Sequence, residues 1–257
     1  MSGQDSVGVR IPEDYRCAPD ALRGRVIAVT GATSGIGRSA ALAYAAHGAE
    51  VVLIARSEER LNSVCDEIEA AGGPPPAAIC FDFQSDDQAA YASMGPAIAE
   101  QFGRLDGLLL NAGVLGERRP LAQLRWKDWQ TVMQVNVHSQ FLTLQGLLPL
   151  LLEAPSGSVI FTSSGVGRRA RAYWGAYTVS KFATEAMMQL LADETDSTSS
   201  LRVNAINPGA TNTAMRRSAY PGETPEDNVS PDAIMDTYLY LMDAASDGRS
   251  GLSFDAQ

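Results

Sequence analysis

A tyrosine and a lysine four residues apart have side chains and a spacing that suggest chemistry. Tyr177 and Lys181 would lie on one face of a helix, so their polar ends can converge. A phenol with a pKa of about 10 is a poor base at neutral pH, and a nearby ammonium lowers that pKa by favouring the phenolate. Lys181 is one of only two lysines in 257 residues, so a chance pairing is rare. The pair predicts proton transfer to or from a substrate.

A glycine-rich stretch at residues 30–37 is the second candidate. It follows an apolar run at 25–29, typical of a buried strand, and precedes an alanine-rich segment at 38–47 that favours a helix. This order places free backbone N–H groups at the positive end of a helix, where a pyrophosphate can bind. The glycines would allow, in turn, a tight turn, close approach of the phosphate and packing of helix on strand: Gly31, Gly35 and Gly37. The spacing differs from the commoner G-x-G-x-x-G, so an ordinary glycine-rich turn remains an alternative.

Strands and helices alternate along the rest of the chain, which predicts how these residues are positioned. The expected strands are 25–29, 51–55, 77–81, 108–110, 158–162, 201–206 and 252–254. The expected helices are 38–47, 57–70, 86–102, 126–153, 173–194 and 231–244. We therefore expect an α/β fold: a single Rossmann-type domain with a doubly wound, seven-stranded parallel sheet and helices on both faces. Ligands of such sheets bind beyond the carboxyl ends of the strands.

Composition narrows the class of protein. The formal net charge of −10 argues against nucleic acid or an anionic membrane as a partner. Residues 1–24 have no apolar core typical of a signal and read as an N-terminal extension on the surface, with the domain at 25–257. Three scattered cysteines favour a reduced, cytoplasmic protein. Neither His47 nor His138 has further ligands nearby in sequence, so no metal site is expected.

Six motifs together resemble the short-chain dehydrogenase/reductase family, in order and at about the family's spacing. They are T-G-x-x-x-G-I-G at 30–37, Asn111-Ala112-Gly113, Asn136, Ser164, Tyr177-x-x-x-Lys181 and Asn207-Pro208-Gly209. The resemblance covers the chain from Arg23 onward. Within the family the chain looks most like a bacterial branch of reductases of unassigned substrate, which it resembles at 174–177 and 254–257.

The resemblance implies roles for four catalytic residues. Tyr177 would be the general acid in carbonyl reduction, or the base in alcohol oxidation. Ser164 would hold the substrate oxygen, and Lys181 would lower the pKa of Tyr177 and bind the nicotinamide ribose. Asn136 would support a water that relays protons towards Lys181.

The resemblance also implies which residues bind the cofactor. Asp82 would meet the adenine, Asn111 would lie along the cofactor, and Thr211 with Thr213 would hold the nicotinamide carboxamide. The full expected set is Gly31, Thr33, Ser34, Gly35, Ile36, Gly37, Arg56, Asp82, Asn111, Ala112, Gly113, Tyr177, Lys181, Pro208, Gly209, Thr211 and Thr213.

The end of the second strand indicates which nicotinamide cofactor is preferred. An acidic residue there would bind the adenosine 2′-hydroxyl and repel a 2′-phosphate. This chain has Ala55 followed by Arg56. Ser34 stands where many NADP-dependent members have a basic residue, so the preference depends on Arg56, with Arg38 as a second contributor. We expect NADP(H) to be preferred over NAD(H).

Arginines gather where the strands end, although the protein is acidic. Seven follow the fourth, fifth and sixth strands and are expected on loops: Arg118, Arg119, Arg168, Arg169, Arg171, Arg216 and Arg217. One interpretation is a positive rim that attracts the cofactor and an anionic substrate. The alternative is that they are solvated loop residues.

The function expected from the resemblance is hydride transfer between NADP(H) and a small-molecule carbonyl or secondary alcohol. A catalytically silent sensor or scaffold that binds NADP(H) is the alternative, although sensors usually lose the catalytic residues retained here. An enoyl reductase would want tyrosine and lysine more widely spaced. The family also suggests a homodimer or homotetramer through two apolar helical stretches, 132–152 and 176–191.

Overall fold

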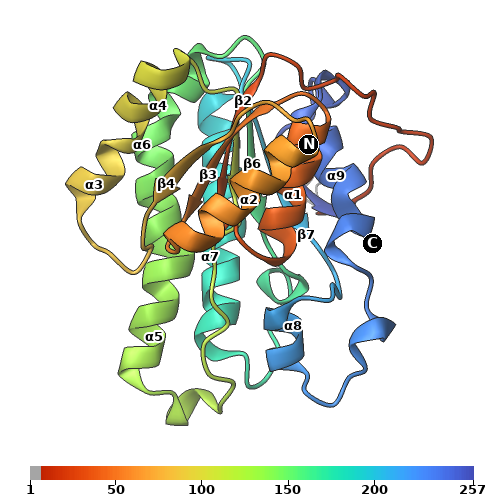
Figure 1. Ribbon diagram of the computed structural model, residues 1–257. Coiled ribbons are helices and arrows are strands. Elements are labelled where there is room, and N and C mark those ends of the chain that lie inside the picture. The colour runs from red at the N-terminus through yellow and green to blue at the C-terminus, as the bar shows by residue number, and fades with distance from the viewer. Residues whose placement is uncertain (1–6) are drawn as a thin grey trace.

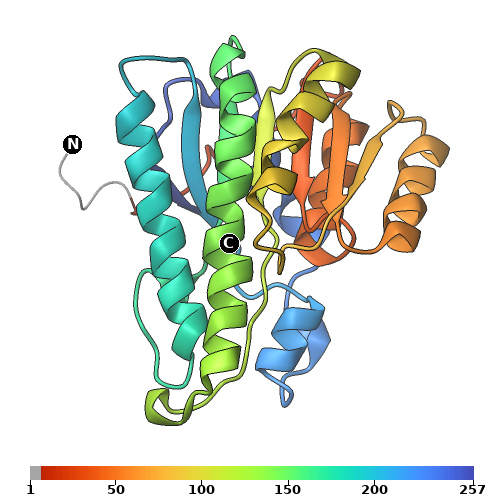
Figure 2. The same ribbon diagram turned by 90° about the vertical axis from the view of Figure 1, so that its left-hand side faces the viewer.

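The computed structural model describes residues 7–257, and in them one parallel sheet lies between two layers of helices (Figures 1 and 2). The eight strands are β1 (Val7–Val9), β2 (Val26–Thr30), β3 (Glu50–Ala55), β4 (Ala77–Cys80), β5 (Gly107–Leu110), β6 (Ser158–Thr162), β7 (Arg202–Asn207) and β8 (Leu252–Asp255). Their order across the sheet is β1-β8-β7-β6-β5-β2-β3-β4. The expected fold class is confirmed, with one strand more than the seven predicted.

The additional strand is β1, which pairs with β8 at the edge of the sheet. Residues that follow β1 also pack on the body of the protein, because Ile11, Tyr15 and Cys17 adjoin the core and the Tyr15 hydroxyl donates to Asp243 at 2.9 Å. The three residues of β1 are too few to show a strand pattern in the sequence.

The helices follow the predicted alternation. They are α1 (Gly35–Ala46), α2 (Glu58–Ala70), α3 (Gln88–Ala92), α4 (Met94–Phe102), α5 (Trp126–Met133), α6 (Ser139–Glu153), α7 (Gly175–Thr195), α8 (Ala214–Ala219) and α9 (Met235–Met242). The helix expected at 126–153 contains a π-helical turn at Gln134–His138, which joins α5 to α6. In the described part of the chain no helix is long and apolar enough to span a membrane.

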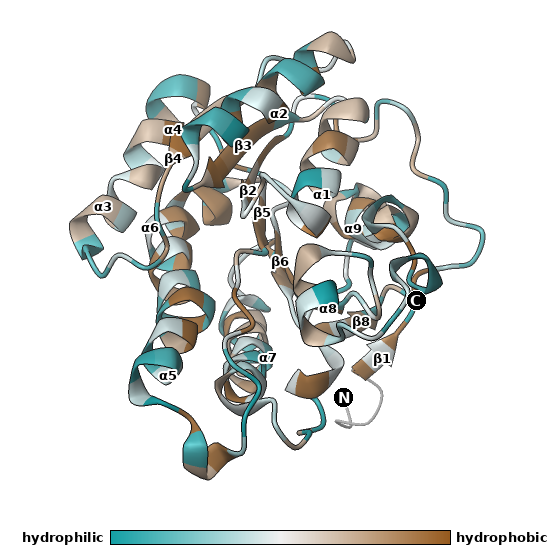
Figure 3. Ribbon diagram, turned by 60° about the horizontal axis from the view of Figure 1, so that its bottom comes forward, coloured by the Kyte–Doolittle hydropathy of each residue, from teal (hydrophilic) through white to brown (hydrophobic). Residues whose placement is uncertain are grey.

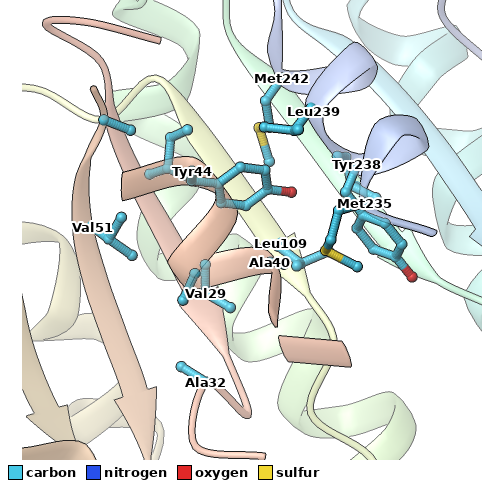
Figure 4. Close-up of a cluster of buried hydrophobic side chains, with 14 of the residues drawn as sticks. Val29, Ala32, Ala40, Tyr44, Val51, Leu109, Met235, Tyr238, Leu239 and Met242 are labelled. Carbon is cyan, nitrogen blue, oxygen red and sulfur yellow. The ribbon is translucent and has the colours of Figure 1, made fainter. Parts of the chain in front are cut away.

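Alternate residues of each strand face two separate cores, as expected for parallel strands buried on both faces. Ile27 and Val29 of β2 face the core beneath α1, α2 and α9, whereas Val26 and Ala28 face the core beneath α4, α6 and α7. Figure 4 shows the first core, where Tyr44 of α1 lies between β3 and α9. Helices pack on both faces of the sheet and restrict movement of the strands. The residues at the strand ends are therefore fixed relative to one another.

Candidate active site

Because the strands are parallel, the carboxyl ends of β2, β5, β6 and β7 lie at the same end of the sheet. This end is the one beside α8 (Figure 3). The chain winds outward in opposite directions from between β2 and β5, which is the point where doubly wound folds bind ligands. A groove of about 540 Å³ lies here. The predicted site residues that line it are Gly31, Ser34, Gly35, Ile36, Asn111, Ala112, Gly113, Ser164, Tyr177, Lys181, Pro208, Gly209, Thr211 and Thr213.

Tyr177 and Lys181 lie one turn apart on α7, and both are buried against the sheet. The Lys181 Nζ atom is 5.6 Å from the centre of the Tyr177 ring, and it donates a hydrogen bond of 2.7 Å to the carbonyl oxygen of Thr162 at the end of β6. The two polar ends therefore converge in the groove, as the i, i+4 spacing predicts.

Burial is the largest influence on the pKa values of Tyr177 and Lys181. Burial raises the pKa of Tyr177 to about 12, while hydrogen bonding to Ser164 acts in the opposite direction. Burial also lowers the pKa of Lys181 to about 8, although the charge of Glu185 acts to raise it. The net shift of the phenol's pKa is upward, because loss of hydration outweighs the other contributions. The expected lowering of this pKa by the ammonium of Lys181 stays a prediction. The phenol is held protonated at neutral pH, ready to donate.

Two serines follow β6, and the structure separates their roles. Ser163 is buried, and its hydroxyl donates to the carboxylate of Glu185 on α7. Ser164, in extended backbone conformation, lines the groove close to Tyr177. Its hydroxyl is the one available to a substrate oxygen.

Asn136 lies in the π-helical turn, fully buried and outside the lining of the groove. Its Oδ1 accepts from the backbone N–H of Val114 at 2.8 Å, and its Nδ2 donates to the carbonyl of Val114 and to Ser180 Oγ. This side chain joins the loop after β5 to α7. Its expected support of a proton-relaying water stays a prediction.

The glycine turn is shaped to bring backbone close to a ligand. Gly31 and Gly35 have left-handed φ angles of +68° and +51°, which suit glycine. A Cβ on Gly37 would collide with the Gly31 carbonyl and the Asn111 side chain, so only glycine lets α1 pack on β2 here. Ser34 precedes α1 without capping it, which leaves the N–H groups of the first turn without a side-chain acceptor. These features fit the phosphates of a dinucleotide.

A hydrogen-bond network that sequence reasoning missed connects the strand ends. Thr30 Oγ1 accepts from the backbone N–H groups of Asn111 and Ala112, which joins β2 to the end of β5. Asn111 Oδ1 in turn accepts from Thr162 at 3.3 Å. Thr30, the first residue of the glycine motif, could have indicated this network, because its hydroxyl has no other evident role in the motif.

The last residue of the chain holds the loop after β7. Gln257 Nε2 donates to the carbonyl of Pro208 at 2.6 Å and to Thr211 Oγ1 at 3.3 Å. Thr213 Oγ1 accepts from the N–H of Arg216 and so begins α8. Both threonine side chains thus have partners within the loop, and their predicted contact with the carboxamide stays untested.

Five predicted residues lie outside the lining of the groove: Thr33, Gly37, Arg56, Asp82 and Asn136. Arg56 is exposed at the end of β3. Arg38 does line the groove, and it forms an ion pair with Glu67 of α2. Asp82 Oδ1 accepts from the backbone N–H of Gln84, 3.0 Å away. In residues 7–257 no group of three or more potential metal ligands occurs.

The seven arginines do not all lie on exposed loops, as was expected. Arg168 is largely buried and bonds Asp255 at 2.6 Å, which ties the loop after β6 to β8. Arg216 and Arg217 belong to helix α8 rather than to a loop. A partner far away in sequence, Asp255, fixes the orientation of Arg168. Arg169 and Arg171 are exposed and line a second pocket beside the groove.

The chain is similar to known proteins along most of its length. The short chain dehydrogenase family model matches residues 25–224. The uncharacterized oxidoreductase YciK of Escherichia coli K12 is 49% identical over 243 residues, 95% of this chain and 96% of that protein. A structure from Shigella flexneri 2a, described as a short chain dehydrogenase complexed with NADP, has a TM-score of 0.91 at 48% identity, covering 93% of this chain and 100% of that one. One from Escherichia coli CFT073, complexed with NADPH, has a TM-score of 0.91 at 49% identity, covering 93% and 99%.

Proposed function

The chain belongs to the short-chain dehydrogenase family, and we propose that it is an NADP(H)-dependent enzyme that interconverts a carbonyl compound and a secondary alcohol. The observation that carries the proposal is the buried pair of Tyr177 and Lys181 beside Ser164, in a groove that the glycine turn also lines. Chemistry of this kind needs a proton donor at the carbonyl oxygen and a site that excludes water.

The chain's own residues supply the proton and orient the oxygen. The bound nicotinamide supplies or accepts the hydride. Tyr177 gives its phenolic proton to the carbonyl oxygen during reduction, and takes it back during oxidation. The Ser164 hydroxyl donates a hydrogen bond to that oxygen as negative charge develops. Lys181 stabilises the phenolate that remains and binds the ribose hydroxyls.

NADP(H) is the cofactor we propose, for two reasons. Ala55 and Arg56 stand at the end of β3, so the site has a cation and lacks the carboxylate that would repel a 2′-phosphate. Two relatives about half identical in sequence are solved with NADP or NADPH. The phosphates would lie on the N-terminus of α1, at Gly35 and Ile36.

We propose a homodimer or homotetramer built through α6 and α7. Phe141 and Leu152 are exposed on α6, and Val179, Phe182 and Leu190 are exposed on α7. The spacing within each set places it on one helix face. Figure 2 shows these two helices, in green and teal, in front of the sheet.

A panel of aldehydes and ketones, followed by loss of NADPH absorbance, tests the activity. We expect reduction of at least one carbonyl, and Tyr177→Phe should lower kcat by about 10²–10⁴-fold because the proton donor is lost. NADPH binding, measured by fluorescence, should change little in this variant. Equal rates in the two proteins, or no turnover by the wild type beside tight NADPH binding, would favour the silent sensor instead.

A further inference from the structure

A second pocket of about 640 Å³ adjoins the groove at Ser164. Its lining includes Ser164, Arg169, Arg171, Trp174, Arg216 and Tyr220. Ser164, Trp174 and Arg216 line the groove as well, so the two spaces adjoin at these residues. If Ser164 holds a substrate oxygen, the remainder of the substrate extends into this second space, which we call the arginine pocket.

Tyr220 is the centre of an arginine cluster at this pocket. The Arg216 guanidinium lies over its ring, 3.9 Å from the ring centre, and that of Arg118 lies 5.0 Å from it. The Arg171 Nη1 atom donates to the Tyr220 hydroxyl at 3.3 Å. Arg118 also bonds the carbonyl of Ala219, and it lies 4.8 Å from the centre of the Trp174 ring. The aromatic rings thus hold the guanidinium groups in place.

The charge of this cluster is only partly compensated. Arg216 forms an ion pair with Glu223 at 2.6 Å. Of the carboxylates in the described part of the chain, none lies within ion-pairing distance of Arg118, Arg169 or Arg171. The whole protein carries a net charge of −10, so three arginines without a carboxylate partner around one pocket are a marked local exception.

The turn that carries Arg171 is strained. The N–H of Trp174 bonds the carbonyl of Arg171, and between them Tyr173 has a left-handed φ of +71°, the only such non-glycine residue among those described. A side chain with a Cβ costs about 1 kcal/mol or more in this conformation. The turn places Arg171 and Trp174 together at the pocket wall, and strain retained at such a place is typical of a binding site.

We infer that the arginine pocket binds an oxyanion, a carboxylate or a phosphate, carried by the substrate at a distance from its carbonyl group. The inference rests on the proposed function and gives its substrate class. Arg171 and Arg169 contact the oxyanion, since a planar guanidinium can donate two parallel hydrogen bonds to either group. Arg216, already paired with Glu223, and Arg118 hold the aromatic wall.

Paired substrates test this with NADPH at saturation. The carboxylate series is acetoacetate, levulinate and 5-oxohexanoate, each beside its methyl ester, and the phosphate arm is hydroxyacetone phosphate beside hydroxyacetone. We expect kcat/KM at least tenfold higher for one anion than for its neutral partner. The double variant R169Q/R171Q should abolish this advantage and leave the rate on the neutral compound within twofold. Arg60→Gln, an exposed arginine on α2, is the matched control and should change neither.

The outcomes separate this inference from the proposed function. Turnover of neutral carbonyls with no preference for any anion would overturn the inference and leave the function intact. A raised KM for NADPH in R169Q/R171Q, with an unchanged anion preference, would assign the arginines to the cofactor and also overturn it. If no carbonyl is reduced, titration of the NADP-loaded protein with levulinate and hydroxyacetone phosphate by calorimetry decides. Saturable binding lost in the double variant supports the pocket, and its absence refutes it.

Discussion

At the scale of single residues, two buried ionisable groups with opposite shifts define the site. Burial raises the pKa of Tyr177 to about 12, which favours the neutral phenol. Burial also lowers the pKa of Lys181 to about 8, which disfavours the charged ammonium. Both shifts disfavour the charged form, which is the sign that desolvation imposes. A proton donor that stays protonated and a cation that is held with little water around it suit reduction, in which charge appears only as the proton leaves.

The lowered pKa of Lys181 predicts a pH-dependent stability. Between a pKa of about 8 in the folded state and the ordinary 10.5, the unfolded chain binds a proton that the folded chain has released, so the free energy of unfolding rises with pH. We expect wild type to gain about 2 kcal/mol relative to Lys181→Met between pH 7 and 9.5. Urea unfolding of both proteins measures this, and a constant difference across the range would contradict it.

The position of Arg56 leads us to predict a preference for NADP(H) over NAD(H). Arg56→Asp replaces a cation by a carboxylate at the end of β3, where a 2′-phosphate would be repelled. The ratio of kcat/KM for NADPH to that for NADH should fall by about tenfold or more, since one charge contact of this kind is worth 1.4 kcal/mol or more. Arg60→Asp makes the same charge change on α2 and should leave the ratio as it was; an unchanged ratio in both would remove Arg56 from the site.

At the scale of elements, the close contact between α1 and β2 and the bend within the α5–α6 helix position the site. Gly37 lets α1 approach the strand ends, and the π-helical turn directs Asn136 into the contact with Val114 and Ser180. Short π-helical insertions inside long helices often accompany functional sites. The loops that shape the groove are therefore held by residues that lie outside its lining.

Gly37→Ala tests the close contact. The new Cβ meets the Gly31 carbonyl and the Asn111 amide, so α1 must shift away from β2. We expect a loss of about 1–3 kcal/mol in the free energy of unfolding, as overpacking commonly costs, and weaker NADPH binding. Gly222→Ala is the control, because a Cβ there meets nothing within 4 Å. Equal stability and equal NADPH affinity in the two variants would show that the contact is unimportant.

Much of the element pattern could be predicted because it is local. Continuous apolar runs mark strands buried on both faces, and all seven predicted strands are present within a residue or two of their expected ends. The orientation of Arg168 could not be predicted, since its partner Asp255 is 87 residues away. The raised pKa of Tyr177 also depends on neighbours that only the folded chain brings together. Short α8 lacks a periodic pattern long enough to detect.

At the scale of the whole molecule, the distribution of apolar surface supports the proposed association through α6 and α7. Phe141 on α6 and Phe182 on α7 expose 51% and 43% of their surface, unusual for such side chains in a monomer. Two helices that present aligned apolar residues suit a symmetric interface, in which the same surface of each copy meets the other.

Replacing Phe141 and Phe182 together by glutamate should break this interface. The added charges would be buried without partners on association, which costs several kcal/mol. We expect the mass in solution, measured by light scattering after size exclusion, to fall by about half. Leu121→Glu changes a more exposed apolar residue elsewhere, at 70% exposure, and should leave the mass unaltered. A wild type that is already monomeric would contradict the prediction outright.

The short strand β1 has a consequence for solubility. The outer edge of a parallel sheet offers unpaired backbone groups on which other chains can grow into aggregates. Here β1 occupies that edge of β8, and it is itself only three residues long, irregular in register, with Gly8 at a φ of +74°. A strand so brief and uneven is a poor template for further growth. A chain shortened to begin at β2 would keep its catalytic groups but would expose the edge of β8. We expect this shortened chain to precipitate at a lower temperature than the full chain.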